Sequence, residues 1–234
     1  QKVDLSGILY KPQPKEGLGV FCQDTNEPYD KAELNEKLIQ HYLESISEKT
    51  GLTSSFPIMN TDRSVGARLS GEIAKQHGNQ GMASDPITVN LTGTAGQSFG
   101  VWNAGGLNMV LTGDANDYVG KGMTGGKLVI RPESGSAFKS NESVIAGNTC
   151  LYGASGGELY VAGCAGERFA VRNSGASTVV EGIGDNGCEY MTGGIVTVLG
   201  ETGVNFGAGM TGGFAYILDS NDELTPRLNN ELVE

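Results

Sequence analysis

Pairs of adjacent glycines recur along this 234-residue chain and constrain its fold more than any other feature. The first glycines of successive repeats are separated by 20, 31, 19, 18 and 19 residues, when Gly175-Ala176 is counted as a degenerate copy. Such a period is typical of a solenoid, in which each repeat stacks on the next. The long interval can hold one repeat plus an insertion around 132–143. The pairs themselves lie at 105–106, 125–126, 156–157, 193–194 and 212–213.

The residues that follow each pair predict one short strand per repeat. Counting starts at the second residue of each glycine pair. The residue four positions later is β-branched in all six repeats, and the residue two positions later is mostly apolar. Positions two apart lie on one face of a strand, so these side chains should form an inward column. No repeat has room for a helix as well, which disfavours βαβ units and leucine-rich repeats. We therefore expect a mainly β protein, a parallel β-helix with strands about 4.8 Å apart. The expected column is Val110, Ile130, Val161, Val180, Val198 and Ile217.

Glycine content also divides the chain. Residues 1–92 hold eight of the 37 glycines and residues 93–213 hold the other 29. We expect a lead-in and helical capping or linker segment at 1–85, a parallel β-helix at 86–218, and the start of a truncated C-terminal extension at 219–234. The lead-in over 1–29 should be extended. The first residue is Gln rather than Met, so the chain reads as a piece of a longer protein.

Two helices are predicted in the N-terminal segment, and one of their faces should pack on the coils, because a solenoid needs capped ends. The first should begin at a capping box over 30–33 and end at a left-handed Gly51. The second should begin at Asp62 and stop at Gly78. Their apolar faces are Leu34, Leu38, Tyr42 and Ile46 for the first, and Val65, Leu69 and Ile73 for the second.

Two segments match Gly-x-Gly-x-x-Gly, the pattern of a dinucleotide-binding turn. That site needs a helix directly after the glycines. Here 127–130 and 214–217 have the composition of strands, so the glycines should instead shape coil turns. The expected turn glycines are Gly105, Gly106, Gly120, Gly122, Gly125, Gly126, Gly156, Gly157, Gly193, Gly194, Gly207, Gly209, Gly212 and Gly213.

The charge excludes several classes of partner. The net charge is −11, from 16 basic and 27 acidic residues, and no basic cluster exists to bind nucleic acid or an anionic membrane. The two histidines, His41 and His77, fall on predicted helices and are not expected to act as bases. The four cysteines are widely spaced, so we expect mostly buried free thiols and no metal site.

Acidic residues are numerous in the repeats but do not recur at one position, so no metal ladder is implied. They are compatible with a solvated exterior or with a carbohydrate-active groove. Asn186 and Asn205 both stand seven residues before a glycine pair and predict a stack of amides. Tyr160 and Tyr216 should point outward, toward a partner or the N-terminal helices. The acids are Asp114, Asp117, Glu158, Glu167, Glu181, Asp185, Glu189 and Glu201.

Several longer segments resemble the C-terminal GXGXG domain of the glutamate synthase large subunit. A related domain occurs in a formylmethanofuran dehydrogenase subunit. The resemblance implies a right-handed parallel β-helix of about six to seven coils. The matching segments are 60–70 (NTDRSVGARLS), 96–101 (GQSFGV), 113–126 (GDANDYVGKGMTGG), 166–175 (GERFAVRNSG), 203–213 (GVNFGAGMTGG) and 229–234 (NNELVE).

The resemblance implies a non-catalytic scaffold within a cytoplasmic enzyme of nitrogen metabolism that makes glutamate from glutamine and 2-oxoglutarate. Its implied partners are the glutaminase and FMN-binding domains of the parent chain and a small electron-supplying subunit. FMN and the 3Fe-4S cluster would be held by the parent, with no cofactor, metal or catalytic residue here, so the fragment should be inactive. The alternatives are a carbohydrate-active or sugar-binding β-helix, or a separately encoded subunit of a formylmethanofuran dehydrogenase-like complex.

Overall fold

A computed structural model describes residues 3–10, 13, 15–17, 19, 21–22, 25, 33–78 and 81–233. The chain divides into two compact units, Gln1–Lys31 and Ala32–Glu234. The described residues of the first unit contain turns at 6–8 and 16–17 and no helix or strand. Much of the expected lead-in, and residues 30–32 of the expected capping box, lie outside the described residues.

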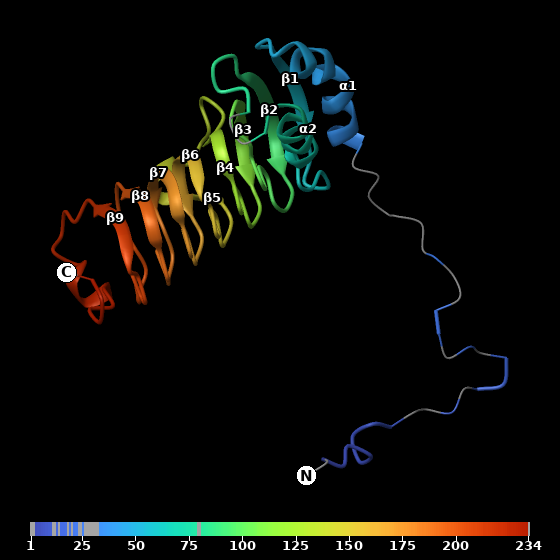
Figure 1. The fold of residues 1–234 in the computed structure, drawn as a ribbon. Coiled ribbons are helices and arrows are strands. Elements are labelled where there is room, and N and C mark those ends of the chain that lie inside the picture. Colours follow the sequence, from blue (N-terminus) through green and yellow to red (C-terminus); the bar gives the residue numbers. More distant parts are fainter. Residues whose placement is uncertain are drawn as a thin grey trace. The chain divides into compact units, whose positions relative to one another are not determined.

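The second unit is a solenoid of about seven turns, whose parallel strands lie side by side (Figure 1). The strand order β1-β2-β3-β4-β6-β7-β8-β9 follows the chain, which confirms the expected parallel β-helix. The short β5 pairs with β3 and β6 beside this path. The strands are β1 Thr53–Ile58, β2 Ile87–Ala95, β3 Leu107–Ala115, β4 Thr124–Arg131, β5 Val144–Ala146, β6 Gly156–Ala165, β7 Ser174–Gly182, β8 Thr192–Val198 and β9 Gly212–Ile217.

One inward column runs through the strands from β3 to β9. Its register pairs each member with the next, in the order Leu111, Ile130, Val161, Val180, Val198 and Ile217. The expectation that Val110 belongs to it is wrong. Val110 pairs with Val129, and both residues are half-buried. The fully buried residues of β3 are instead Leu107, Met109 and Leu111. The turn after the first glycine pair is one residue longer than the turns after the other pairs, so the inward positions of β3 are shifted by one residue.

Two helices, α1 Glu33–Glu48 and α2 Ala67–His77, pack on the first coils. The predicted apolar faces are buried, and the Tyr42 hydroxyl of α1 donates to the Thr88 carbonyl of β2 at 3.0 Å. His41 also contacts Phe56 edge-to-face, which places α1 against β1. The solenoid is therefore covered by helices at its N-terminal end. The strand β1 between the helices was not predicted from the sequence.

The helix boundaries differ from expectation at two points. At the end of α1 the left-handed residue is Lys49 (φ 56°), not Gly51. Gly66 (φ 97°), not Asp62, is the N-cap of α2, and Asp62 instead accepts a hydrogen bond from the Met59 amide. The chain must turn sharply here to place the Gly66 amide on the Asn35 side chain, and glycine adopts that conformation at little cost. Gly78 (φ 62°) ends α2 as predicted.

The remaining elements are short. The long interval between glycine pairs holds a 3₁₀ turn, η2 Ser140–Glu142, before β5, as expected for an insertion. A second 3₁₀ turn, η3 Thr225–Arg227, follows β9. No helix in the described part of the chain is long and apolar enough to cross a membrane.

Candidate functional site

The glycine motifs lie at one corner of the solenoid, where left-handed residues alternate along the chain. In one coil Tyr118, Gly120 and Gly122 have φ of 64°, 63° and 62°. The same pattern recurs in six stacked coils. Its members are Ser98, Gly100 and Trp102; Tyr118, Gly120 and Gly122; Thr149, Leu151 and Gly153; Arg168, Ala170 and Arg172; Asn186, Cys188 and Tyr190; and Asn205, Gly207 and Gly209.

The amides of this corner bind neighbouring coils in alternate directions. Tyr118 and Gly122 donate to carbonyls of the next coil, and Gly120 donates back to Phe99 at 2.9 Å. A phosphate site needs such amides free to point at the ligand. Here they are already paired, and a strand rather than a helix follows the Gly-x-Gly-x-x-Gly segments at both places. The corner therefore stabilises the stack and has no geometry for a dinucleotide.

The glycine pairs form a second kind of turn, in which the two glycines have different roles. The second glycine, such as Gly126 (φ 71°), is left-handed. The first glycine, such as Gly193, lies so close to the Ser174 carbonyl of the preceding coil that a Cβ would collide with it. Both features exclude a larger side chain without local movement.

Two buried asparagines brace these turns and were missed from the sequence. The side-chain amide of Asn103 donates to the carbonyls of Leu107 (2.8 Å) and Gly125 (2.9 Å). Asn173 holds both the amide and the carbonyl of Ala176. Each asparagine stands two residues before a glycine repeat, at 105 and 175, and this spacing is the signal that could have identified them.

The predicted amide stack is confirmed and is longer than expected. The side chain of Asn205 donates to Asn186 Oδ1 at 2.8 Å, and the side chain of Asn229 donates to Asn205 Oδ1 at 2.9 Å. Asn229 belongs to the segment after β9, so the ladder continues onto the chain that covers the last coil.

Most of the acidic residues identified in the sequence hold coils together or pair with a base. Asp117 and Asp185 each accept an amide of the next coil, from Asn148 and Val204 respectively, at 2.8 Å. Asp114 accepts from the Thr94 hydroxyl. The ion pairs are Glu158 with Lys127, Glu189 with Arg168, and Glu201 with Arg227.

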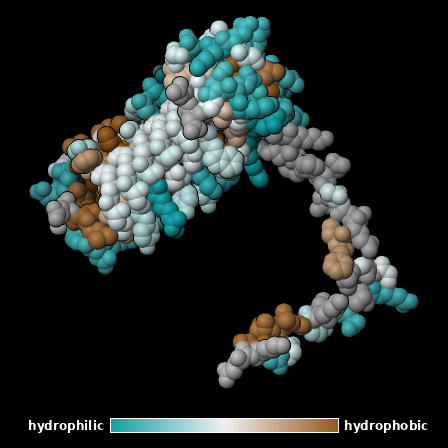
Figure 2. Space-filling model, viewed as in Figure 1, coloured by the Kyte–Doolittle hydropathy of each residue, from teal (hydrophilic) through white to brown (hydrophobic). Residues whose placement is uncertain are grey.

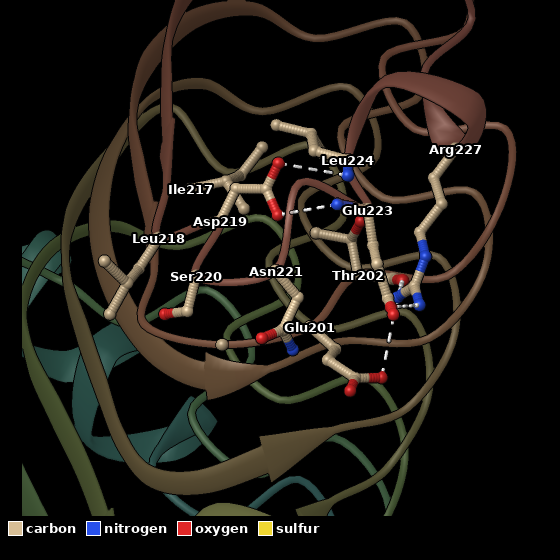
Figure 3. A pocket seen from close by; sticks show the side chains of 11 residues that line it. Glu201, Thr202, Ile217, Leu218, Asp219, Ser220, Asn221, Glu223, Leu224 and Arg227 are labelled. Carbon is tan, nitrogen blue, oxygen red and sulfur yellow. Dashed lines mark hydrogen bonds and ion pairs between the residues drawn. The ribbon is translucent and has the colours of Figure 1, made fainter.

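The segment after β9 is pinned to the last coil around a small pocket of about 90 Å³ (Figure 3). Arg227 donates to the Thr202 carbonyl and pairs with Glu223 (2.8 Å) and Glu201 (3.5 Å). Asp219 accepts the amides of Glu223 and Leu224, and the hydrogen bond from Glu223 lowers the pKa of that carboxyl. A space of this size holds a few waters, and its charges are already paired.

A larger depression of about 760 Å³ lies along the coil ends beside β5 and η2. Four carboxylates line it, those of Glu142, Glu167, Glu181 and Glu201. Its lining contains no histidine and no aromatic ring on which a sugar could stack. Among the residues that the structure describes, no group of three or more His, Cys, Asp or Glu side chains is arranged to hold a metal ion.

The thiols are poorly suited to chemistry. Burial raises the pKa of both Cys150 and Cys188 to about 12. Burial, with Glu181 and Glu201 nearby, also raises the pKa of Cys164. A catalytic cysteine reacts as its thiolate, so these three side chains are poor nucleophiles.

The histidines tie elements of the N-terminal cap together. His41 on α1 shares a hydrogen bond with the Ser54 hydroxyl of β1 at 2.6 Å. The ring of His77 at the end of α2 contacts the Ile46 carbonyl of α1. Both side chains therefore have structural partners within the cap.

Comparison with known proteins relates this fold to one family. The family model described as GXGXG motif matches residues 33–234. The ferredoxin-dependent glutamate synthase of Pyropia yezoensis is 57% identical over 190 residues, which cover 81% of this chain and 12% of that protein. For the NADH glutamate synthase of Schizosaccharomyces pombe the identity is 51% over 201 residues, 86% of this chain and 10% of that protein. The large chain of the NADPH glutamate synthase of Bacillus subtilis is 47% identical over 217 residues, 93% of this chain and 14% of that protein.

The chain thus spans only about an eighth of the length of the curated relatives it matches. The matched region nevertheless contains both predicted helices and every strand of the solenoid. On the match over residues 33–234, this chain belongs to the GXGXG motif family.

Proposed function

We propose that this chain is a non-catalytic scaffold domain of a glutamate synthase, which supports the glutaminase and FMN-binding domains of a longer parent chain. The observation that carries the proposal is the use of the corner amides. The backbone amides that a glycine-rich motif would offer to a ligand donate their hydrogen bonds instead to carbonyls of neighbouring coils. The parent would make glutamate from glutamine and 2-oxoglutarate with chemistry located in its other domains.

The names of the relatives support a role that is independent of the electron donor. They specify ferredoxin, NADH and NADPH, yet this region is 47% to 57% identical to all three proteins. A region that recognised the donor should differ among them, because the donors differ in size and chemistry. Binding of the donor therefore belongs to other parts of the parent.

The side chains support the same assignment for FMN and the 3Fe-4S cluster. Among the described residues no three His, Cys, Asp or Glu side chains are grouped to hold a metal, and the paired amides at Gly120 and Gly122 do not fit a flavin phosphate. Both cofactors would be bound outside this chain. The free thiols of the solenoid suit a reducing compartment such as the cytoplasm.

The outer face of the sheet supports contact with other domains. Tyr160 is 37% exposed and Tyr216 is 58% exposed, and both lie in one outward column of the sheet. Exposed aromatic side chains on a flat surface are typical of protein interfaces. We assign this face to the neighbouring domains of the parent.

An assay of the isolated chain tests the proposal. Glutamine, 2-oxoglutarate, FMN and a reductant should yield no glutamate and no ammonia, and dialysis should leave no flavin absorbance on the protein. Turnover, or one bound flavin per chain, would contradict a scaffold role.

The four-carboxylate depression is the one feature that favours a second function, a sugar-binding or carbohydrate-active groove. Calcium and a panel of acidic and neutral oligosaccharides can be titrated against the thermal unfolding of the chain. We expect no shift in the melting temperature. A saturable rise that disappears in the variant Glu181→Gln would favour the groove over the scaffold.

A further inference from the structure

Three bulky side chains stand in a column of the left-handed corner where glycine would fit more easily. The third left-handed residue of each coil belongs to this column, and it is glycine in three of the six coils. In the other three coils it is a tryptophan, an arginine or a tyrosine. A residue with a Cβ adopts this conformation only at a cost in free energy that glycine avoids. In stacking order the column is Trp102, Gly122, Gly153, Arg172, Tyr190 and Gly209.

These three side chains make few contacts within the domain that would offset this cost. Trp102, the only tryptophan of the chain, is 63% exposed, and Tyr190 is 56% exposed. Each ring lies over a glycine of the next coil, Trp102 over Gly122 and Tyr190 over Gly209. Arg172 is exposed, and no residue that the structure describes forms an ion pair with it. Strained residues with exposed side chains are characteristic of binding sites.

A hollow over Gly153 separates the indole of Trp102 from Arg172. Gly153 is exposed, and a Cβ built on it would meet no atom within van der Waals distance. With coils about 4.8 Å apart, its Cα lies about 5 Å from that of Arg172 and about 10 Å from that of Trp102. The hollow therefore has room for one apolar side chain of another protein, between the indole and the guanidinium.

Two cations stand beside this hollow on a surface that is otherwise poor in charge. The coils in view in Figure 2 are mostly pale, of intermediate hydropathy. Lys121, in the coil between Trp102 and Gly153, places its Nζ 5.4 Å from the centroid of the Tyr118 ring, and Arg172 lies on the other side. Acids of these coils are engaged elsewhere: Asp117 and Asp185 accept amides, Glu189 pairs with Arg168, and Glu167 lines the depression beside β5.

We propose that the corner face formed by Trp102, Tyr118, Lys121, Arg172 and Tyr190 binds an acidic segment of another domain of the parent chain. This inference rests on the proposed function. An apolar side chain of that segment lies over Gly153, and its carboxylates pair with the two cations. Tryptophan, tyrosine and arginine are the residue types that most often dominate the binding energy of an interface. About seven-eighths of each curated relative lies outside this region, so the parent has many other segments that can meet the corner.

Side chains rather than the backbone make this contact. The amides of Trp102, Arg172 and Tyr190 donate to carbonyls of the next coil, so the corner cannot accept an added strand. The corner is also separate from the outward column of the sheet that carries Tyr160, because its residues precede the strands. The domain therefore has a second face for neighbouring parts of the parent.

A photo-cross-link tests where the segment binds. In a full-length glutamate synthase containing this region, p-benzoylphenylalanine in place of Trp102 should cross-link to an acidic segment elsewhere in the same chain, identified by mass spectrometry. The matched control replaces Phe138, which is 48% exposed in the insertion before η2, and should not reach that segment. The proposal is overturned by no cross-link at position 102, by one to a segment without acidic residues, or by one to a second copy.

A pair of substitutions of equal size tests the charge of the partner. Asparagine and aspartate both tolerate a left-handed conformation, and the space at Gly153 is open. In the full-length protein, Gly153→Asp should speed hydrogen exchange of the cross-linked segment by about tenfold or more relative to Gly153→Asn, because the added carboxylate repels an acidic partner. Equal exchange rates in the two variants would contradict an acidic partner.

A glycine substitution separates binding from support of the solenoid. Trp102→Gly installs the residue that the same column carries in three other coils, so the isolated chain should keep its melting temperature. In the full-length protein the same variant should speed exchange of the cross-linked segment by about tenfold or more. A lower melting temperature with unchanged exchange would show that Trp102 only supports the solenoid. Failure of these tests leaves the scaffold assignment standing, because turnover by the isolated chain tests that assignment separately.

Discussion

The inward side chains in the middle of the column are enclosed by the coils on both sides. Val198 is fully buried and lies between Val180 and Ile217 in the column. Its neighbour Thr197 is half-buried on the outer face of the same strand. These two adjacent β-branched residues of β8 therefore form a matched pair, in which one side chain faces the interior and the other faces outward.

Val198→Asp should lower the free energy of unfolding by about 3–5 kcal/mol, because it places an unpaired carboxylate among aliphatic side chains. Thr197→Asp should cost less than about 1 kcal/mol, since its carboxylate stays in water. Urea denaturation of both variants measures the difference. Equal stability of the two would mean that the inward face is misassigned.

The buried thiols predict a pH dependence. Burial raises the pKa of Cys150 and Cys188 from 9.0 in the unfolded chain to about 12. The folded state therefore keeps protons that the unfolded state loses, and the contribution to stability is complete below pH 9 and declines as the pH rises toward 12. Each thiol should remove up to about 1.4 kcal/mol per pH unit in this window.

Denaturation at pH 8 and pH 10 can be compared for the wild type and the double variant Cys150→Ala, Cys188→Ala. The double variant should be less stable at pH 8 but should lose less stability between the two pH values. The same loss in both proteins would show that these thiols are not the source of the alkaline destabilisation.

At the level of the element, sequence periodicity identified the strand that follows each glycine repeat, because the interior positions of these strands alternate regularly. Five of the six β-branched residues counted from the glycine repeats share one column. The count failed in β3, where a longer turn precedes the strand and moves Val110 to the outer face. Spacing alone cannot show how many residues a turn uses.

The left-handed corner could be predicted only in part. Glycine marks it at Gly120 and Gly122, but the equivalent positions Arg168, Ala170 and Arg172 are also left-handed. These three residues disfavour the left-handed conformation. Hydrogen bonds to the neighbouring coils, such as the one from the Arg168 amide to the Asp185 backbone carbonyl, hold them in it. Such tertiary control leaves no signal within one repeat.

The corrected register of β3 predicts a reversal between neighbouring residues. Leu111→Asp should lower the free energy of unfolding by about 3–5 kcal/mol, because Leu111 is fully buried in the column. Val110→Asp should cost clearly less, since its side chain lies on the outer face. Thermal unfolding of both variants would contradict the register if Val110→Asp were the more damaging.

For the molecule as a whole, the sequence predicted the solenoid, the helices at its N-terminal end and the use of glycines in its turns, but not the surfaces. The predicted amide stack joined Asn186 and Asn205, and the structure adds Asn229 from the chain that follows β9. The acids that line the depression near β5 come from separate coils and from the insertion, so no motif groups them. Their grouping emerges only when the coils stack.

The scaffold proposal requires this domain to contribute stability and support rather than chemistry. Its decisive test is glutamate formation by a full-length glutamate synthase that contains this region, with Glu142, Glu167, Glu181 and Glu201 all changed to Gln. We predict an unchanged turnover rate. A loss of about 10²-fold or more in a folded variant, the size expected when a general acid or base is removed, would contradict the claim.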